Sequence, residues 1–337
     1  MDKNKIKEVV ENIIDNMNEF SGVIKISKEN KVIYEKCYGF ADVSNKRLNN
    51  IDTRFGIASG AKLLTAVAIC KLVEQGKLRF DSLLKDYVDF DNFDKNVTVK
   101  HLLTHTSGIP DYFDEDVMDD FSELWINNPM YMMKEPENFL KLMKNQKSMF
   151  KPGEKFHYNN GGFVILAYIV EKVSGMSFID FVKENIFDVL GMNSSGYFSM
   201  DMLPQNCAYG YIENDDGKLK TNIYSIPIIG GGDGGVFVTA DDMSTLWDGL
   251  LNYKLLSKNI TDELLTPAAH DTGNEYYGYG IWIAKRNDNI FKYYITGSDP
   301  GVSFASEYYP DEKVEITILG NREFNAYKFI KEIENIN

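Results

Sequence analysis

The chain has 337 residues, of which 44% are hydrophobic, 13% aromatic and 26% charged. This length and mixture can bury a large core, so we expect a globular protein, and the composition excludes disorder, collagen and coiled coil. The 36 Lys and Arg residues stand against 50 Asp and Glu residues, which gives a formal net charge of −14. A surface field of that sign repels polyanions, so nucleic acid is not an expected partner.

Cysteine usage and the amino-terminal segment bear on the compartment. Cys37, Cys70 and Cys207 are widely spaced, which fits reduced thiols better than a disulfide framework, and they form no metal-binding pattern. The amino-terminal segment is polar and lacks the apolar run of a signal peptide. No stretch approaches the roughly 20 apolar residues of a membrane span. We therefore expect no membrane span and a cytoplasmic protein, with an extracytoplasmic role left open.

Strand patterns stand at both ends of the chain, and helical patterns fill the middle. After a first helix, the short KEN segment joins two β-rich runs, 20–27 and 31–42, as an antiparallel hairpin. A helix is predicted over 61–78, and strand character returns near 235–238 before a helix that ends at about Leu251. Between them, helices are predicted over 98–105, 120–128, 137–145, 160–174 and 177–190. Four strands at hairpin spacing and a final helix close the chain, the strands covering 276–286, 289–297, 302–310 and 313–321.

This order of elements predicts an α/β (α+β) protein with one sheet assembled from both ends of the chain. We expect residues 1–80 with 232–337 to form an antiparallel sheet flanked by terminal helices, and residues 81–231 to form a mainly helical domain. A cleft between two such domains is where small-molecule sites usually form.

The first candidate for chemistry is the pair Ser59 and Lys62 in the segment FGIASGAKLLTAVAIC. Residues three apart lie on one helical face about a turn apart, so the amine can reach the hydroxyl. The apolar neighbours disfavour the ammonium form and leave Lys62 able to act as a base. A lone Ser-x-x-Lys is common by chance, and a capping serine with a solvated lysine is then the simpler interpretation.

Two further motifs change that interpretation. Tyr158-Asn159-Asn160 stands at a helix entry, and Thr296-Gly297-Ser298 lies on a strand near the carboxyl terminus. With these three motifs in this order, the chain resembles the serine β-lactamase and penicillin-binding protein superfamily, in its branch of class C β-lactamases and D-alanyl-D-alanine carboxypeptidases. Segments such as VTVKHLLTHTSGIPDY and GGGDGGVFVTADDM extend the resemblance over roughly residues 20 to 322. The resemblance implies a β-lactamase/transpeptidase-like fold.

The resemblance also implies a role for each motif residue. Ser59 matches the nucleophile that forms an acyl-enzyme, and Lys62 the lysine beside it. Tyr158 matches the tyrosine of proton shuttling, and Asn160 the side chain that orients the lysine and the substrate amide; whether Lys62 or Tyr158 is the general base is left open. In the strand motif, the backbone N–H groups of Ser59 and Ser298 would form the oxyanion hole, with Thr296 and Gly297 lining the substrate site.

One position departs from the pattern of the superfamily. Ile295 stands before Thr296 where the superfamily usually has Lys or His, a cation implied in binding the carboxylate of a D-Ala-D-Ala terminus or of a β-lactam. Lys292 cannot replace it, because strand alternation puts positions 292 and 295 on opposite faces. The substitution favours neutral acyl substrates such as esters or non-carboxylate amides without excluding a peptidase.

Other signals receive simpler interpretations. His101 and His105 have the spacing of a helical zinc pair but lack the glutamate of that motif, so we expect helix packing and turn bonding. His157, beside Tyr158, is a candidate for tuning the site. The GGGDGG segment, residues 230–235, is expected to be a tight passage near the cleft rather than a phosphate loop. Cys70 is expected to be a small buried residue.

The sequence therefore predicts a serine hydrolase that acts on an ester or amide through a Ser59 acyl-enzyme, without metal or cofactor. D,D-peptidase, β-lactamase and esterase activities compete within this hypothesis, and the expected partner is a small-molecule or short-peptide substrate. The alternative is a non-catalytic or slowly deacylating protein that senses a peptide or lactam. The sequence gives no prediction of oligomeric state.

Overall fold

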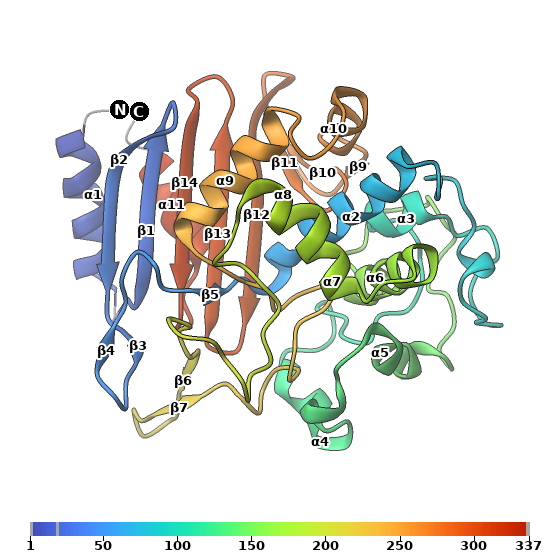
Figure 1. Ribbon diagram of the computed structural model, residues 1–337, viewed down its shortest axis with the longest axis horizontal. Helices are drawn as coiled ribbons and strands as arrows, with labels where there is room; N and C mark the ends of the chain where they lie inside the picture. The colour runs from blue at the N-terminus through green and yellow to red at the C-terminus, as the bar shows by residue number, and fades with distance from the viewer. Residues whose placement is uncertain (1–2, 18–19, 335–337) are drawn as a thin grey trace.

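A large antiparallel sheet forms the centre of the molecule. The computed structural model describes residues 3–17 and 20–334, and Figure 1 shows the sheet with helices on both sides. Its eight strands lie in the order β2 (Lys31–Tyr38), β1 (Gly22–Lys28), β14 (Val314–Gly320), β13 (Val302–Tyr309), β12 (Asn289–Asp299), β11 (Trp282–Arg286), β10 (Glu275–Tyr277) and β9 (Ala269–His270). Strand β1 pairs with β14 from Gly22 opposite Gly320 to Lys28 opposite Val314. The prediction of one sheet built from both ends of the chain is confirmed.

The predicted hairpin between β1 and β2 is present. Glu29 and Asn30 form its two-residue turn with φ values of 51° and 60°. Two successive residues with positive φ match the right-handed twist of the flanking strands, and Asn tolerates this conformation well. The KEN segment therefore acts as a hairpin signal without a glycine.

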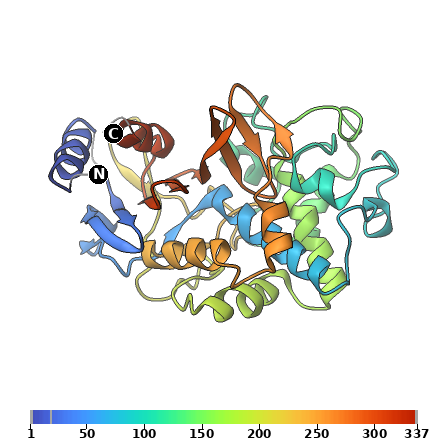
Figure 2. The same ribbon diagram turned by 90° about the horizontal axis from the view of Figure 1, so that it is seen from above.

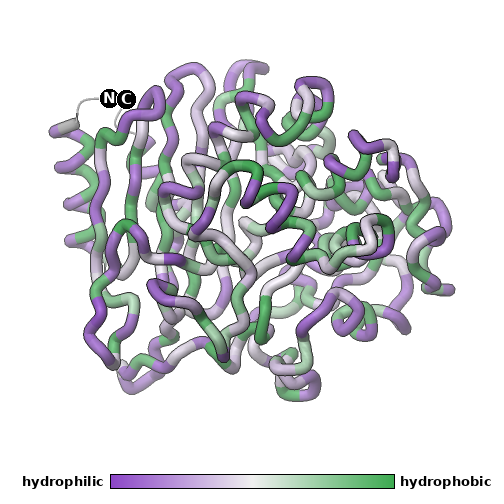
Figure 3. The backbone as a smooth tube through the Cα atoms, viewed as in Figure 1, coloured by the Kyte–Doolittle hydropathy of each residue, from purple (hydrophilic) through white to green (hydrophobic). Residues whose placement is uncertain are grey.

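The terminal helices cover one face of the sheet. Helices α1 (Lys3–Asp15) and α11 (Ala326–Glu334) lie beside each other (Figure 2). Ile6 and Ile330 of these helices share a buried cluster with Ile24 of β1 and Ile316 of β14. In Figure 3 the tube of α1 is hydrophobic on the side next to the sheet and hydrophilic on its outer side. This amphipathic pattern is the reason why the two ends of the chain fold onto the same surface.

The main core lies on the opposite face of the sheet. Helix α9 (Ala240–Leu251) packs there, and its Trp247 donates a hydrogen bond to Ser306 of β13 at 2.8 Å. Helices α2 (Lys62–Glu74) and α6 (Asn160–Ser174) contact each other within the same core. Helix α2 is apolar around most of its circumference, as expected for a helix enclosed by protein.

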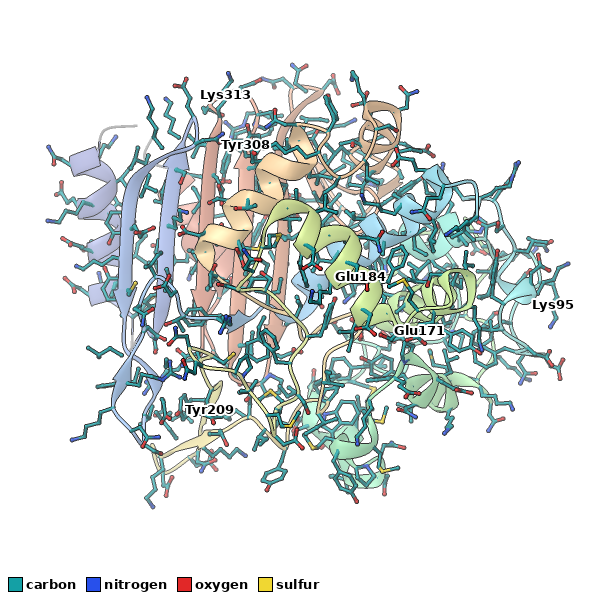
Figure 4. The ribbon with its side chains drawn as sticks, viewed as in Figure 1. Lys95, Glu171, Glu184, Tyr209, Tyr308 and Lys313 are labelled. Carbon is teal, nitrogen blue, oxygen red and sulfur yellow. The ribbon has the colours of Figure 1, made fainter. Side chains whose placement is uncertain are left out.

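The middle of the chain consists of short helices joined by loops. It contains α3 (Val99–Leu103), α4 (Leu124–Asn127), α5 (Pro136–Met143), α6, α7 (Phe178–Val182) and α8 (Asp188–Leu190), with short helices η2 (Leu84–Asp86), η3 (Phe121–Glu123) and η4 (Met130–Met132). The predicted helix 177–190 is divided by a π-helical turn, η5 (Lys183–Phe187). Glu171 of α6, labelled in Figure 4, accepts the backbone N–H of Phe178 at 2.9 Å and so ties α6 to α7.

Some predicted boundaries were wrong. The run 276–286 is not one strand, because the chain turns at Gly280, which has a φ of 68° and lies so close to α2 that a Cβ there would stand 2.6 Å from the Lys62 carbonyl oxygen. The helix predicted from residue 61 is preceded by a 3₁₀ turn, η1 (Ala58–Ala61). Helix α10 (Lys258–Leu264) was not predicted. Short strand pairs add β3 (Phe40–Asp42) with β4 (Arg47–Leu48), β5 (Phe55–Gly56) with β8 (Phe237–Val238), and β6 (Tyr211–Glu213) with β7 (Leu219–Thr221).

The described residues contain no single helix that is long and apolar enough to cross a membrane. By length and composition alone, one strongly bent pair passes that test, α6 together with Phe178–Leu190, with a bend of 81°. The division into two discontinuous domains at residues 80 and 232 stays a prediction.

Candidate active site

Ser59 lies in the 3₁₀ turn η1, directly before helix α2. The preceding residue, Ala58, is buried and has a φ of 44°. This value lies in the left-handed region, which residues other than glycine seldom adopt. Such backbone strain persists only where the surroundings enforce it, and it clusters at functional sites. The turn places Ser59 in the wall of a cleft with a volume of about 1360 Å³.

Lys62 is the first residue of α2, and its side chain is only 1% exposed. Its Nζ lies 2.8 Å from Ser59 Oγ, 2.8 Å from Asn160 Oδ1 and 2.9 Å from the backbone carbonyl oxygen of Asp233. An ammonium group can donate to all three oxygens. A neutral amine keeps two donated bonds, to Asn160 and Asp233, and then presents its lone pair to the Ser59 hydroxyl.

Tyr158 and Asn160 reach Lys62 from the amino-terminal end of α6. Asn159 caps this helix by accepting the N–H of Gly162 at 2.6 Å. The buried carboxylate of Asp111 accepts the N–H of Asn160 at 2.5 Å and that of Gly161 at 2.8 Å, which satisfies two further donors at the helix end. The helix start is therefore fixed by backbone bonds, and this fixes the position of the Asn160 side chain.

The Tyr158 ring is held on several sides. Lys62 Nζ lies 4.9 Å from the ring centroid, His105 packs at a centroid distance of 4.3 Å, and Trp282 stacks at 6.2 Å. The Ser59 side chain also lies close enough to the Tyr158 phenol to act on its pKa. The three motif residues Ser59, Lys62 and Tyr158 thus form one connected group.

Asn160 is saturated with hydrogen bonds. Its Oδ1 accepts from Lys62, while its Nδ2 donates to the backbone carbonyl of Phe113 at 3.1 Å and to Glu115 Oε1 at 3.0 Å. A primary amide has only two N–H hydrogens, so both are used within the protein. The sequence predicted that Asn160 also orients a substrate amide, but in this structure its donors are occupied by Phe113 and Glu115.

The segment Thr296-Gly297-Ser298 of β12 lines the other side of the cleft. A Cβ on Gly297 would lie 2.1 Å from the carbonyl oxygen of Ile57 and 2.9 Å from the backbone nitrogen of Ser59. Only glycine permits this approach of β12 to the Ser59 turn. The backbone nitrogens of Ser59 and Ser298 remain the candidate oxyanion donors.

Ile295 and Lys292 lie on opposite faces of β12, as predicted. Ile295 is 2% exposed and belongs to the main core, whereas Lys292 is buried on the side of α11, where it pairs with Glu307 at 2.7 Å and Glu334 at 2.6 Å. The position before Thr296 therefore brings no cation to the cleft.

Carboxylates surround the Lys62 amine. Asp233, Glu115 and Asp299 line the cleft, and each acts on Lys62 by charge. Tyr112 donates a hydrogen bond to Asp233. Desolvation raises the pKa of Asp299 to about 7, and the nearby Asp233 carboxylate contributes to this rise. Burial raises the pKa of Asp111 to about 7 as well, although the N–H groups of α6 act against it.

Burial shifts the pKa values of the two candidate bases in opposite directions. The pKa of Lys62 is lowered because burial disfavours the ammonium, although nearby carboxylates oppose this shift. The pKa of the Tyr158 phenol is raised well above its usual value, chiefly by burial. Burial therefore favours the neutral amine of Lys62 and the protonated phenol of Tyr158, which makes Lys62 the candidate base.

The histidines and glycines have structural explanations. His101 Nδ1 accepts the N–H of Thr98 in the cap of α3, and His105 Nδ1 accepts the N–H of Asn159, in agreement with the predicted packing and turn bonding. In the GGGDGG segment, a Cβ on Gly232 would lie 2.3 Å from the Phe163 carbonyl oxygen, so the predicted tight passage is present. Cys70 is fully buried, as predicted.

His157 lies between two carboxylates at the edge of the cleft. Its Nε2 is 3.3 Å from Asp114 and its Nδ1 is 3.3 Å from Asp116, and these aspartates flank Glu115 in sequence. The three side chains are close enough to be candidates for holding a metal ion. We call these three side chains, Asp114, Asp116 and His157, the His157 latch.

Sequence reasoning missed Asp111, Tyr112, Glu115 and Asp233. The first three follow the HTSGIP segment, and Asp233 interrupts a run of glycines. For Asp233, the available signal was an acidic residue inside a run of glycines.

A known protein family matches almost the whole chain. Residues 10–336 match the family Beta-lactamase. The chain belongs to the Beta-lactamase family. Penicillin-binding protein 4* of Bacillus subtilis is 28% identical over 319 residues, which cover 91% of this chain and 69% of that protein. Teichoic acid D-alanine hydrolase of Staphylococcus aureus is 25% identical over 324 residues, covering 94% of this chain and 74% of the other.

A solved structure supports the fold assignment. The crystal structure of a penicillin binding protein from Bacillus halodurans superposes with a TM-score of 0.93 at 45% identity and covers 98% of this chain and all of that one. The fold is therefore that of the β-lactamase and transpeptidase proteins, as predicted. The family match and relatives such as the teichoic acid D-alanine hydrolase indicate that the protein is a serine hydrolase that acts on amide or ester bonds.

Proposed function

We propose that Ser59 is the nucleophile of this Beta-lactamase family hydrolase and that Lys62 is its general base. The observation that carries the proposal is the 2.8 Å contact between Lys62 Nζ and Ser59 Oγ, with Asn160 and Asp233 holding the amine on its other sides. A base must lie within hydrogen-bond reach of the proton that it removes. The lowered pKa of Lys62 supplies the neutral amine.

The reaction follows from these positions. Ser59 transfers its proton to Lys62 as Oγ bonds to the substrate carbonyl carbon, and the N–H groups of Ser59 and Ser298 receive the negative oxygen. When the tetrahedral intermediate collapses, the leaving oxygen or nitrogen takes the Tyr158 proton, and the Lys62 ammonium restores it. Water then attacks the acyl-enzyme by the same steps in reverse, which releases the acid and regenerates Ser59.

Two residues of β12, Ile295 and Lys292, bear on the choice between peptidase, β-lactamase and esterase activity. Ile295 gives no cation to a substrate carboxylate, and Lys292 is paired on the far side of the sheet. We propose that the protein cleaves esters or amides without a carboxylate near the scissile bond, in preference to a D-Ala-D-Ala terminus or a β-lactam. The relative named teichoic acid D-alanine hydrolase supports an acyl group of amino-acid size.

Steady-state hydrolysis tests this proposal. p-Nitrophenyl acetate and benzylpenicillin are offered to the wild type, to Ser59→Ala and to Ser44→Ala, a control at an exposed serine in the turn between β3 and β4. We expect the ester to be cleaved by the wild type and the control, not by Ser59→Ala, and penicillin to be cleaved poorly. Ester hydrolysis that survives in Ser59→Ala contradicts the proposal.

A further inference from the structure

The part of the cleft next to Asn160 is occupied by a carboxylate. Glu115 Oε1 accepts one N–H of Asn160, and the backbone carbonyl of Phe113 accepts the other. A substrate carbonyl can find no free donor on Asn160 unless it displaces one of these partners. The groups next to Asn160 are therefore hydrogen-bond acceptors, so a substrate group that binds there must donate hydrogen bonds.

Glu115 can accept a second hydrogen bond. Glu115 is exposed and lines the cleft. Among the described residues, none forms a hydrogen bond with its Oε2. The ionised carboxylate offers several lone pairs, of which the Asn160 bond uses one. A chain of three hydrogen bonds joins Ser59 to Glu115 through Lys62 and Asn160, and the Glu115 charge acts on both Lys62 and Tyr158, so Glu115 lies near the reacting group.

The charge balance of the site favours a cation. Among the described residues, eight Asp or Glu side chains and a single lysine, Lys220, line the cleft. Near Ser59, the carboxylates of Glu115, Asp233 and Asp299 act on Lys62. When Lys62 is the neutral base that the proposed function requires, these carboxylates lose their counterion. A positive group on the substrate would replace it, whereas a carboxylate on the substrate would add to the repulsion.

We infer that the substrates of this cleft carry a primary ammonium group on the acyl part, close to the scissile carbonyl, and that Glu115 binds this ammonium. This inference rests on the proposed function and narrows its substrate class to aminoacyl esters and amides with a free amino group. The His157 latch holds Asp114 and Asp116 on either side of Glu115 and so keeps the carboxylate in place.

Three amides with the same leaving group test the inference. Alanine p-nitroanilide, in both configurations, carries the ammonium; propionyl p-nitroanilide lacks it; and N-acetylalanine p-nitroanilide replaces it with a neutral amide. In the wild type we expect kcat/KM to be at least about tenfold higher for one enantiomer of the free amine than for either neutral compound, as one charge-assisted hydrogen bond allows. Equal values for the three amides overturn the inference.

Matched variants locate the effect. Glu115→Gln keeps an acceptor for Asn160 but removes the charge, and we expect it to lower kcat/KM for alanine p-nitroanilide about tenfold more than for propionyl p-nitroanilide, which has the same leaving group and no ammonium. Asp119→Asn removes the same charge from another exposed residue that lines the cleft and should leave both values within about twofold. An equal loss on both substrates in Glu115→Gln would mean that Glu115 only positions Asn160, which overturns its binding role.

A binding measurement separates this inference from the proposed function. Calorimetric titration of Ser59→Ala with alaninamide and with propionamide needs no turnover. We expect alaninamide to bind more tightly than propionamide, and the difference to vanish in the double variant Ser59→Ala/Glu115→Gln. If alaninamide binds in this way but no ester or amide is cleaved by the wild type, the catalytic proposal fails and the ammonium site stands. If the esters are cleaved and the two amides bind alike, only the ammonium site fails.

Discussion

Lys62 Nζ and the backbone carbonyl oxygen of Asp233 lie 2.9 Å apart, so a residue in the first turn of α2 is bonded to a glycine-rich loop 171 positions later in the chain. This bond and the one to Asn160 fix two hydrogens of the amine. The lone pair of the neutral amine then points to the Ser59 hydroxyl. The reactivity of the serine therefore depends on long-range contacts that orient the lysine.

Replacement of the lysine should abolish most activity without unfolding the protein. We expect Lys62→Met, which keeps the volume of the buried stem, to lower kcat/KM for p-nitrophenyl acetate by about 10³-fold. Lys62→Arg should be equally inactive, because a guanidinium does not lose its proton near neutral pH. Stopped assays give the rates, and thermal unfolding followed by circular dichroism checks the fold. An active Lys62→Arg variant would exclude lysine as the base.

The pH dependence should report the Lys62 amine. Because burial lowers its pKa, the neutral base becomes more populated as pH rises, so kcat/KM should increase with pH through one deprotonation and then level off. Tyr158→Phe should lower the rate at every pH and leave the midpoint in place, because the Tyr158 phenol keeps its proton over this range. Rate profiles from pH 5 to 10 measure both. A midpoint that disappears in Tyr158→Phe would make Tyr158 the titrating group.

The three ordered motifs could be predicted because each lies within a few residues of sequence. Ser59 and Lys62 share a helical turn, and Tyr158 with Asn160 begins α6, so each motif is visible locally, but it was their order along the chain and the resemblance to the superfamily that identified them. Glu115 and Asp233 could not be placed, since their approach to Lys62 depends on long-range contacts of the loops 111–120 and 230–235. The turn at Gly280 was missed for the same reason, because its need for glycine comes from the Lys62 carbonyl oxygen across the core.

The close approach of β12 to the Ser59 turn should not tolerate a side chain at Gly297. A Cβ there would lie 2.1 Å from the Ile57 carbonyl oxygen, so we expect Gly297→Ala to push the strand away and lower kcat/KM by about 100-fold through loss of the oxyanion geometry. Gly56→Ala is the control, since its Cβ would meet only Val302 at 3.7 Å, an ordinary contact. Ester kinetics on both variants decide the matter. Full activity of Gly297→Ala would contradict the assignment of this strand to the site.

The buried pair of Lys292 and Glu307 should serve stability rather than chemistry. Lys292→Met leaves the fully buried Glu307 carboxylate without its counterion, and we expect the free energy of unfolding to fall by about 3 to 5 kcal/mol. The double variant Lys292→Met/Glu307→Gln should recover part of this loss, because glutamine carries no charge and can still accept from Tyr309. Urea unfolding measures the free energies. A double variant less stable than Lys292→Met would show that the charge itself is not the cost.

The central claim is that the reaction passes through an acyl group on Ser59, and intact-mass analysis of rapidly quenched mixtures tests it most directly. The protein is mixed with excess p-nitrophenyl acetate, quenched in acid during turnover, and digested to locate the label. We expect one acetyl group per chain, on the peptide that carries Ser59, absent from Ser59→Ala and lost at the turnover rate once the ester is exhausted. A label that persists for hours would favour the slowly deacylating sensor, and turnover with no label, or with a label on another residue, would contradict the account.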